Sequence, residues 1–516
     1  MSAPTRKLAV ASLIVMAGFM ASRVLGLVRN VVIAQQFGAG REYEAFIVAL
    51  TVPDLVFQVL AGGAVGSAFI PVFTSYFTRQ QEDEAWRLTS TVMTVAMLAT
   101  GVVALALALL ARPVTELLAP GWDAESKDLT ATLMRTMLVS PILFAVSGFA
   151  TSVLNSFQRF ALTALAPIVY NATIIVGAVV LRPLGIEGVA LGVAAGAALH
   201  LLVQVPGLIA QGMRFRFSLD LRHPGVRSVL RLTGPRMVGL GVMQLSQVMT
   251  VVLGTYLIAG SIGYLNVAWL MIMTPLVLAM AVSTAVFPTL AEESARDRPE
   301  AVREVFLLSL RAILFLTIPM AIGLAILGEP LIRLLFEHGE WSATNTRMTA
   351  YALNFFAIGL VGHAAVEIVD RVFYALEDTR TPVLVASGAF GLNLLLSLVL
   401  MHTSLNFGGL ALASSLAALA EGAVLLRLLS RRVPGLALGP IARSLSRTLA
   451  AGLLMGITIL ALPELLQEQL LLPQTLELAV VVTVVALAGA ATYLLFAWML
   501  GSEEPRLLLR LGRSRG

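Results

Sequence analysis

Two arginines lie in an otherwise apolar stretch near the start of the chain. Arg23 and Arg29 are six residues apart, about 9 Å along a helix, so both guanidiniums can reach one cavity. A guanidinium is always charged, and its paired donors fit phosphate oxygens. The two arginines therefore predict a site for a polyanionic group such as a pyrophosphate. The alternative is that Arg29 extends to an aqueous interface while Arg23 pairs with Glu44 or Asp54.

The next apolar stretch contains a carboxylate beside a helix-bending residue. Asp54 directly follows Pro53, and glycines occur shortly afterwards in residues 61–64. Proline predicts a bent helix, and small residues predict close helix packing. We expect Asp54 either to line the cavity or to form a structural pair with Arg23.

Residues 348–375 hold the most polar cluster in the second half of the chain. His363, Glu367 and Asp370 share one helical face, and Glu367 is spaced to pair with Arg371. A histidine and two carboxylates can bind protons and couple transport to pH. The alternative is structural pairing, because Asp370 and Arg371 are close to the end of the stretch, where long side chains reach water.

Enzyme signatures are missing from the sequence. It contains no phosphate-binding loop of Walker type, no zinc-binding HExxH and no nucleophile elbow. It also contains no cysteine, which removes disulfides and thiolate metal sites. We therefore expect a protein that is not an enzyme and has no cofactor. Any transport is then passive or driven by a gradient or the membrane potential.

Membrane-spanning helices must position these residues. Hydrophobic residues make up 58% of the 516 residues and charged residues only 13%, against about 25% charged in soluble domains. Lipid must therefore cover most of the outer surface. The net charge is +5, but the arginines lie in short loops rather than along one helical face, which argues against a nucleic-acid partner.

Apolar runs of about 20 residues predict an all-α membrane protein with about fourteen spans. The predicted spans are 8–34, 44–77, 88–111, 131–156, 161–181, 188–211, 228–258, 262–289, 305–327, 348–375, 382–402, 407–427, 446–463 and 476–500. One alternating set of connecting segments holds roughly twenty Lys and Arg, and the other roughly six. The positive-inside rule therefore places both termini in the cytoplasm.

The sequence contains a weak internal repeat. Residues 68–73 (AFIPVF) are echoed by residues 285–290 (AVFPTL) near the ends of two spans. The repeat predicts two six-helix lobes, with two extra helices and a cytoplasmic tail after them. The expected divisions are 1–212, 213–432 and 433–516. In transporters, such repeats commonly meet at a central site near the midplane.

Longer motifs resemble one family of bacterial membrane proteins. The opening SRVLGLVR at 22–29, with FGAG at 37–40 and VPDL at 52–55, is similar to the start of MurJ/MviN proteins. The blocks LLFEHG at 334–339 and FYALEDTRTPV at 373–383 match the same family, the second most specifically. The similarity covers nearly the whole chain.

This resemblance implies the fold of the multidrug/oligosaccharidyl-lipid/polysaccharide exporter (MOP) superfamily. In that fold two six-helix lobes surround a cationic cavity, and helices 13 and 14 form a groove for a lipid tail. The implied function is a lipid II flippase of the bacterial inner membrane. It would move the undecaprenyl-pyrophosphate-linked peptidoglycan precursor from the inner to the outer leaflet by alternating access. The implied partners are this lipid substrate, membrane lipids and the cell-wall synthesis machinery.

Several positions match the family's site and several depart from it. Arg23 and Arg29 match its cavity arginines, and Glu44 replaces its usual aspartate. Neutral residues stand where charges are usual: Phe57 and Gln58 for an arginine pair, and Trp269 and Leu270 for an Asp-Arg pair. Some members bind sodium; here only Asn393 remains as a weak trace, because Val251 and Ser397 stand where acids are expected.

The leading hypothesis is therefore lipid II flipping. The residues expected to contact substrate are Arg23, Arg29, Glu44, Asp54 and Gln58. The lost arginines favour one alternative, a flippase or exporter of the same superfamily for another polyprenyl-linked saccharide or a small molecule. Another alternative is a membrane scaffold that transports nothing.

Overall fold

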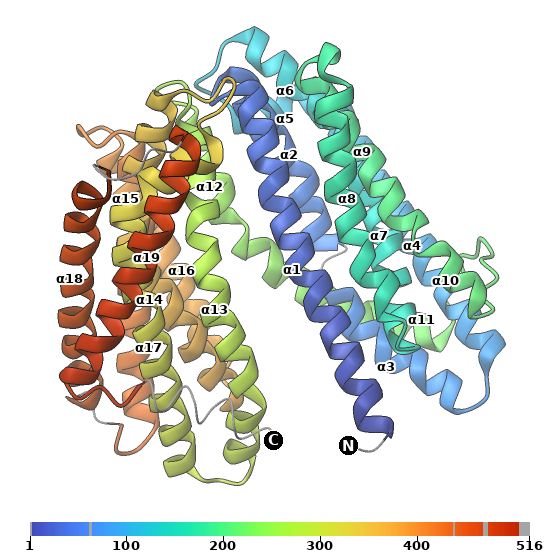
Figure 1. The fold of residues 1–516 in the computed structure, drawn as a ribbon. Helices are drawn as coiled ribbons and strands as arrows, with labels where there is room; N and C mark the ends of the chain where they lie inside the picture. The colour runs from blue at the N-terminus through green and yellow to red at the C-terminus, as the bar shows by residue number, and fades with distance from the viewer. Residues whose placement is uncertain (1–2, 61–63, 437–438, 468–472, 505–516) are drawn as a thin grey trace. The chain divides into compact units, whose positions relative to one another are not determined.

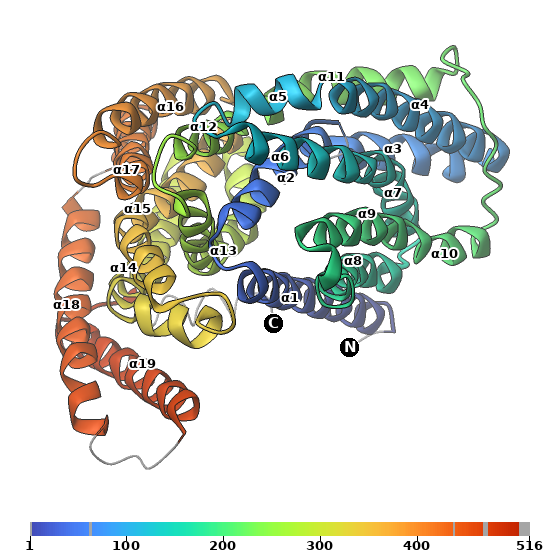
Figure 2. The ribbon, with the colours of Figure 1, turned by 90° about the horizontal axis from the view of Figure 1, so that it is seen from above.

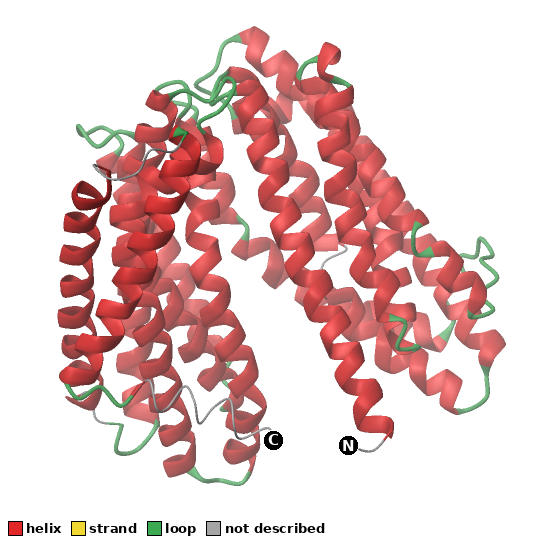
Figure 3. Cartoon of the chain, in the orientation of Figure 1, coloured by secondary structure: helices red, strands yellow, loops and turns green. Residues whose placement is uncertain are grey.

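The computed structural model describes residues 3–60, 64–436, 439–467 and 473–504. Figure 3 shows helices joined by loops throughout these ranges, and no strand occurs in them. The predicted all-α fold is thereby confirmed. The glycines at 62 and 63, expected to aid close packing, lie outside the described residues.

Figure 1 shows the order of the helices along the chain. The first half forms α1 (Ala3–Phe37), α2 (Arg41–Leu60), α3 (Ala64–Thr78), α4 (Glu82–Leu109), α5 (Ala111–Leu118), α6 (Ala124–Met137), α7 (Val139–Ser156), α8 (Phe160–Val180), the short η1 (Arg182–Leu184), α9 (Ile186–Leu202) and α10 (Val205–Ala210). The second half forms α11 (Pro224–Met243), α12 (Leu245–Gly254), α13 (Ser261–Ala295), α14 (Pro299–Phe336), α15 (Ala343–Ala375), α16 (Arg380–Leu400), α17 (Phe407–Arg432), α18 (Gly439–Gln467) and α19 (Gln474–Met499).

Thirteen helices in the described ranges are long and apolar enough to cross a membrane. Every predicted span overlaps one or two of the observed helices. The expected span 228–258 has no counterpart among the thirteen; this region forms α11 and α12, which meet at Gln244. The shorter piece, Leu245–Gly254, is apolar but too short to cross a bilayer alone.

The helices group into two compact units. Unit 1 comprises Met1–Gly263 and Gly339–Trp341, and unit 2 comprises Tyr264–His338 and Ser342–Gly516. The three-residue strap Gly339–Trp341 is held to unit 1 because the backbone N–H of Glu340 donates to the Gln35 carbonyl at 2.8 Å.

Unit 1 has an aromatic core between α3, α4, α7 and α11. Phe69 stacks on Phe73 and meets Phe149 edge-on, with ring centroids 5.3 Å apart in both pairs. Val226 and Val229 of α11 are buried in the same core. Helix α11 therefore packs within unit 1, whereas the division expected from the sequence at residue 213 stays a prediction.

Unit 2 brings α15 and α17 together through glycines. A Cβ added at Gly359 would lie 2.5 Å from the Ser415 Oγ, and one at Gly362 would lie 2.7 Å from the backbone of Ala418. Such sites accept only glycine because the two backbones approach so closely. The α15–α17 pair is therefore a fixed platform for the polar side chains it carries.

The last two helices pack against α14. The Tyr493 hydroxyl of α19 donates to the Phe315 carbonyl at 2.7 Å. Glu504, which follows α19 in the chain, accepts hydrogen bonds from Arg311 of α14 at 2.8 Å and from the Ser444 hydroxyl of α18 at 2.6 Å. Burial raises the pKa of the Glu504 carboxyl, but these hydrogen bonds and the Arg311 charge outweigh it, so the pKa lies below its usual range. The ionised carboxylate thus fastens the end of α19 to α14 and α18.

We expect Gly362→Ala to destabilise the protein by about 1–3 kcal/mol, because the new methyl group overlaps the α17 backbone. Gly388→Ala is the matched control, since a Cβ at Gly388 of α16 meets nothing within 4 Å. That control should be neutral or stabilising by less than about 1 kcal/mol, from helix propensity alone. Thermal unfolding of both variants in detergent measures the difference. Equal unfolding temperatures would contradict the close packing of α15 on α17.

Candidate functional site

Arg29 is held by neutral amides at the contact between α1 and α8. Its Nη1 donates to the Asn171 Oδ1 at 3.1 Å, and its Nε and Nη2 donate to the Asn30 Oδ1 at 3.3 and 3.1 Å. The Asn171 amide donates in turn to the Pro167 carbonyl at 3.0 Å, which fixes its orientation. The half-buried guanidinium is therefore positioned without a carboxylate hydrogen-bonded to it in the described ranges.

Small residues allow this contact between the two helices. A Cβ at Gly18 of α1 would lie 2.5 Å from the Ala164 Cβ of α8. Gly26 lies one turn before Arg29 and faces Asn171, with 3.8 Å from its added Cβ to the Asn171 Oδ1. The glycines set the spacing at which Asn171 reaches the guanidinium.

Asp54 of α2 lies within electrostatic range of Arg29. The charge of Arg29 acts on Asp54 and on the hydroxyls of Tyr43 and Tyr170, although Asp54 forms no ion pair among the described residues. The Asp54 side chain is exposed, and Gln58 is half-buried one turn further along α2. Unit 1 thus brings together two of the expected substrate-contacting residues, Arg29 and Asp54, from different helices.

Arg23 is exposed on α1. Its guanidinium carbon lies 5.1 Å from the centroid of the Phe19 ring, one turn earlier. In the described ranges Arg23 pairs with neither Glu44 nor Asp54, the partners that a purely structural role predicted. The charge of Arg23 is therefore available at the helix surface.

Glu44 is buried and fully engaged, unlike the other expected site residues. Its Oε2 pairs with Arg41 at 3.0 Å, and its Oε1 accepts the backbone N–H of Ile262 at 3.0 Å. Ile262 is in the first turn of α13, where free N–H groups and the helix dipole favour an anion. Arg41 also lies over the Trp122 ring, at 4.6 Å from its centroid. This geometry makes Glu44 a cap that ties α2 to the start of α13.

A histidine on α9 packs with aromatic side chains of α7 and α8. His200 Nδ1 lies 2.7 Å from the Ser147 Oγ, which also accepts from Gln204 at 2.6 Å. The Phe144 ring meets Tyr170 and His200 edge-on, at centroid distances of 5.1 and 5.2 Å. Sequence reasoning missed His200 and Asn171, although a histidine or an amide inside an apolar run is itself a signal.

In unit 2, three carboxylates gather on α15 and α17. The charges of Glu367 and Glu421 both act on Asp370, whose Oδ1 is buried without a hydrogen-bond partner among the described residues. His363, two turns earlier, packs edge-on against Trp269 at 5.4 Å between centroids. Sequence reasoning missed Glu421, which the same rule for charges inside spans would have identified.

The ion pair expected between Glu367 and Arg371 is corrected by the structure. This pair does not occur among the ion pairs of the described residues, and Arg371 acts on Glu367 only at longer range. The guanidinium carbon of Arg371 lies instead 5.8 Å from the centroid of the Phe287 ring on α13. A cation over an aromatic face is attracted by the ring quadrupole, which accounts for this placement.

The weak sodium-site trace at Asn393 takes part in a hydrogen bond within α16. Asn393 and Ser397 are buried one turn apart on α16, and the Ser397 hydroxyl donates to the Asn393 Oδ1 at 3.3 Å. They offer only neutral oxygens, which already bond to each other. No cluster of three or more His, Cys, Asp or Glu side chains suited to a metal occurs in the described part of the chain.

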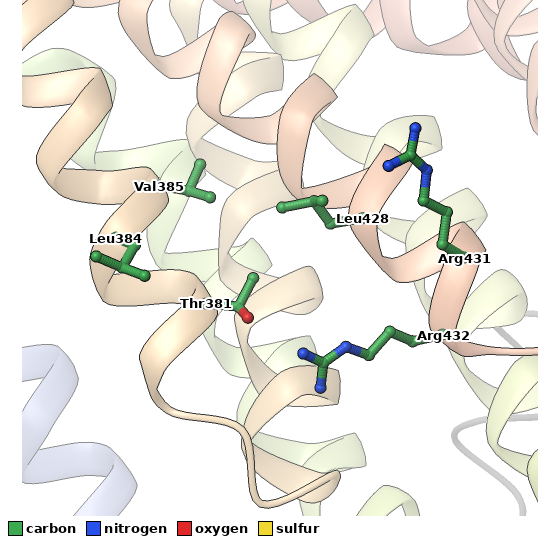
Figure 4. Close-up of a pocket in the computed structure, with 6 residues that line it drawn as sticks. All are labelled: Thr381, Leu384, Val385, Leu428, Arg431 and Arg432. Atoms are coloured by element: carbon green, nitrogen blue, oxygen red, sulfur yellow. The ribbon is translucent and has the colours of Figure 1, made fainter.

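A surface pocket of unit 2 lies apart from these polar groups. Figure 4 shows Thr381, Leu384 and Val385 of α16 facing the end of α17, where the Arg432 guanidinium points toward Thr381 and that of Arg431 points away. The pocket volume is about 340 Å³. Asp378 accepts from the Thr381 hydroxyl at 2.6 Å and pairs with Arg432 at 2.8 Å. These contacts hold the pKa of the Asp378 carboxyl below its usual range. Two of the polar side chains that line the pocket, Thr381 and Arg432, are thus both bound by Asp378.

Comparison with known proteins points to one family. A family model described as lipid II flippase MurJ matches residues 33–496. The chain is 32% identical over 388 residues to the lipid II flippase MurJ of Burkholderia cenocepacia, covering 73% of this chain and 75% of the relative. It is 27% identical over 513 residues to the probable lipid II flippase MurJ of Bdellovibrio bacteriovorus, covering 97% and 96%.

Solved structures share the fold. A lipid II flippase MurJ in an inward closed conformation matches with a TM-score of 0.78 at 24% identity, covering 94% of this chain and 98% of that one. An inward-facing multidrug resistance transporter of the MATE family, from the MOP superfamily, matches with a TM-score of 0.66 at 14% identity, covering 80% and 95%. The fold expected from the resemblance is therefore confirmed.

We expect Glu44→Ala to lower the free energy of unfolding by about 1–3 kcal/mol, because the Ile262 N–H and Arg41 both lose their acceptor. Glu42→Ala is the matched control: Glu42 is in the same first turn of α2 but is exposed. Its effect should stay within about 0.5 kcal/mol. Thermal unfolding in detergent compares the two variants. If both shifted the midpoint equally, Glu44 would not be a cap for α13.

Proposed function

The chain belongs to the MurJ family of lipid II flippases, and on that premise we propose that it moves the undecaprenyl-pyrophosphate-linked peptidoglycan precursor from the inner to the outer leaflet. The family match over residues 33–496 carries the proposal. It also makes the chain a multi-pass transporter of the bacterial inner membrane, with a polyprenyl-linked lipid as substrate. The resemblance seen in the sequence is thereby confirmed.

Exposed charges inside spans support a water-filled chamber. Arg23 and Asp54 are exposed although they lie well inside the spans of α1 and α2. An ionised side chain facing hydrocarbon costs about 2.5–3.5 kcal/mol even on permissive scales. We therefore assign both side chains to water rather than to lipid.

Arg29 is proposed as the main cation for the pyrophosphate. A guanidinium has five N–H donors, and Arg29 uses one on each of its three nitrogens for Asn171 and Asn30. One N–H on each terminal nitrogen is left, which suits paired bonds to two phosphate oxygens. Arg23 would add a second cation about 9 Å away along α1. Asp54 would compete for Arg29 in the empty site and be displaced by substrate.

The polyprenyl tail is proposed to stay in lipid beside α18 and α19. Leu453, Ile457 and Leu460 of α18 recur every three or four residues, and each is more than 60% exposed. Leu494 and Leu495 of α19 are also exposed. Such an apolar stripe fits a hydrocarbon chain, while the head group would cross through the chamber by alternating access.

A second cargo is supported by one departure in α2. Phe57, where the resemblance predicts a cation, packs against Phe144 at 5.0 Å between ring centroids. This part of unit 1 is therefore apolar and would bind phosphate less tightly. The alternative proposal is a flippase for another polyprenyl-linked saccharide, or an exporter of a small molecule.

The carboxylate cluster of unit 2 is proposed to couple transport to a gradient. We expect Asp370→Asn to reduce flipping without lowering membrane levels, because it removes one of three neighbouring carboxyl groups inside the spans. Glu477→Gln, in the first turn of α19, is the control. Flipping in vesicles at several pH values tests this role. An unchanged pH profile for Asp370→Asn would leave the cluster with a structural role.

The proposed orientation follows from the loop charges. Both termini are placed in the cytoplasm, where the basic loops would lie. Partners among the cell-wall synthesis machinery are proposed on the same premise as the cargo, because a flipped precursor must be consumed outside.

Rescue of cells depleted of their own lipid II flippase tests the function. We expect the wild-type chain to restore growth and Arg29→Ala to abolish rescue. Arg29→Lys should restore little, because an ammonium cannot form paired bonds to phosphate. The matched control is Arg182→Ala, since Arg182 is exposed near the start of the α8–α9 connection.

The outcomes separate the alternatives. No rescue by the wild-type chain at normal membrane levels would argue against lipid II as cargo. Full rescue by Arg29→Ala would remove Arg29 from the binding site. A leaflet-accessibility assay that detects translocation in vesicles would exclude the scaffold alternative.

A further inference from the structure

The segment 213–222, between α10 and α11, has an unusual distribution of side chains. It contains no helix, and Figure 2 shows it running past the end of α4 to reach α11. Side chains of an extended chain alternate between opposite sides. We name these ten residues the linking ribbon.

One side of the linking ribbon is fastened to α4. The backbone N–H of Arg216 donates to the Ser90 Oγ at 3.3 Å, and the Thr91 hydroxyl donates to the Ser218 Oγ at 3.0 Å. Asp220 pairs with Arg87 at 2.8 Å. These contacts span one turn of α4 and bury its Ser90 and Thr91 side chains.

The other side of the linking ribbon is apolar and uncovered. Every second residue is a large hydrophobic side chain: Phe215, Phe217, Leu219 and Leu221. Their exposed fractions are 51%, 61%, 54% and 51%. Four such side chains in a row, all turned outward, form an apolar strip that water does not favour.

The anchors of the linking ribbon lie more than two turns inside the spanning helix α4. Its anchors Ser90 and Thr91 lie eight and nine residues after Glu82, the first residue of the spanning helix α4, which is about 12 to 14 Å along the helix axis. Arginines flank the apolar strip at Arg214, Arg216 and Arg222, all exposed. Aromatic and leucine side chains beside arginines are typical of segments that lie in the membrane interface.

We propose that the linking ribbon lies in the interfacial layer of the membrane. Its phenylalanine and leucine side chains enter the acyl region, and its exposed arginines bind the phosphates of anionic phospholipids. Anionic lipid suits the charge of the linking ribbon, because its only carboxylate, Asp220, is already paired with Arg87. The connection between α10 and α11 is thereby anchored to the bilayer as well as to α4. This inference does not depend on the cargo.

A fluorescent probe at one position tests the proposal. The chain has no cysteine, so Phe217→Cys introduces a unique labelling site for an environment-sensitive dye. Asp83→Cys, exposed in the first turn of α4 near the same membrane face, is the matched control. Both labelled proteins are reconstituted into vesicles of neutral lipid with or without phosphatidylglycerol. Quenching is measured with aqueous iodide and with nitroxide-labelled acyl chains.

We expect the dye at 217 to be quenched by the nitroxide lipid, with an iodide quenching constant several-fold smaller than at 83. Equal iodide quenching at both positions would overturn the proposal. Shielding from iodide without nitroxide quenching would also overturn it, because protein would then cover the strip. Phe215→Cys repeats the measurement if the first variant is not monodisperse.

The lipid charge is tested separately. Changing Arg214 and Arg216 together to Gln should weaken nitroxide quenching at 217 in vesicles that contain phosphatidylglycerol, and not in neutral ones. Loss of quenching in both lipids, or in neither, would contradict binding to anionic headgroups.

Discussion

A charged side chain inside a bilayer must find water, a partner or an aromatic face, because hydrocarbon does not solvate it. Three intramembrane charges meet this constraint in three different ways. Glu44 accepts the N–H of a helix end, Arg29 rests on two amide oxygens, and Arg371 lies over Phe287. Asp54 and Arg23 are exposed at the surface of their helices. These two exposed charges, together with the N–H groups that Arg29 does not use for Asn171 and Asn30, are the ones available to a charged ligand.

Close contacts between helices bring these polar side chains within reach of their partners. Asn171 reaches Arg29 because Gly18 and Gly26 let α1 approach α8. The platform of α15 and α17 depends likewise on Gly359 and Gly362. In lipid, where apolar burial gives little drive for helices to associate, this packing decides which polar groups meet.

The sequence predicts the helices well and their contacts poorly. A span is a local property of about 20 residues, so each expected run overlaps one or two observed helices. Arg29 and Asp54 are visible for the same reason. The cap of α13 by Glu44 is not visible, because it joins residues 218 positions apart. The stacking of Arg371 on Phe287 also replaced an ion pair that spacing alone favoured.

The strap Gly339–Trp341 has a consequence for the way the molecule can change shape. Because these three residues belong to unit 1 while their flanks belong to unit 2, the backbone crosses from one unit to the other three times. With a single crossing, one unit could rotate freely about that point. With three crossings, most rotations of one unit against the other would stretch at least one of the connecting segments. A rearrangement between the units therefore requires backbone changes near residues 263, 338 and 341. Two residues of the first unit at these crossings, Gly263 and Gly339, have no side chain to restrict their backbone angles.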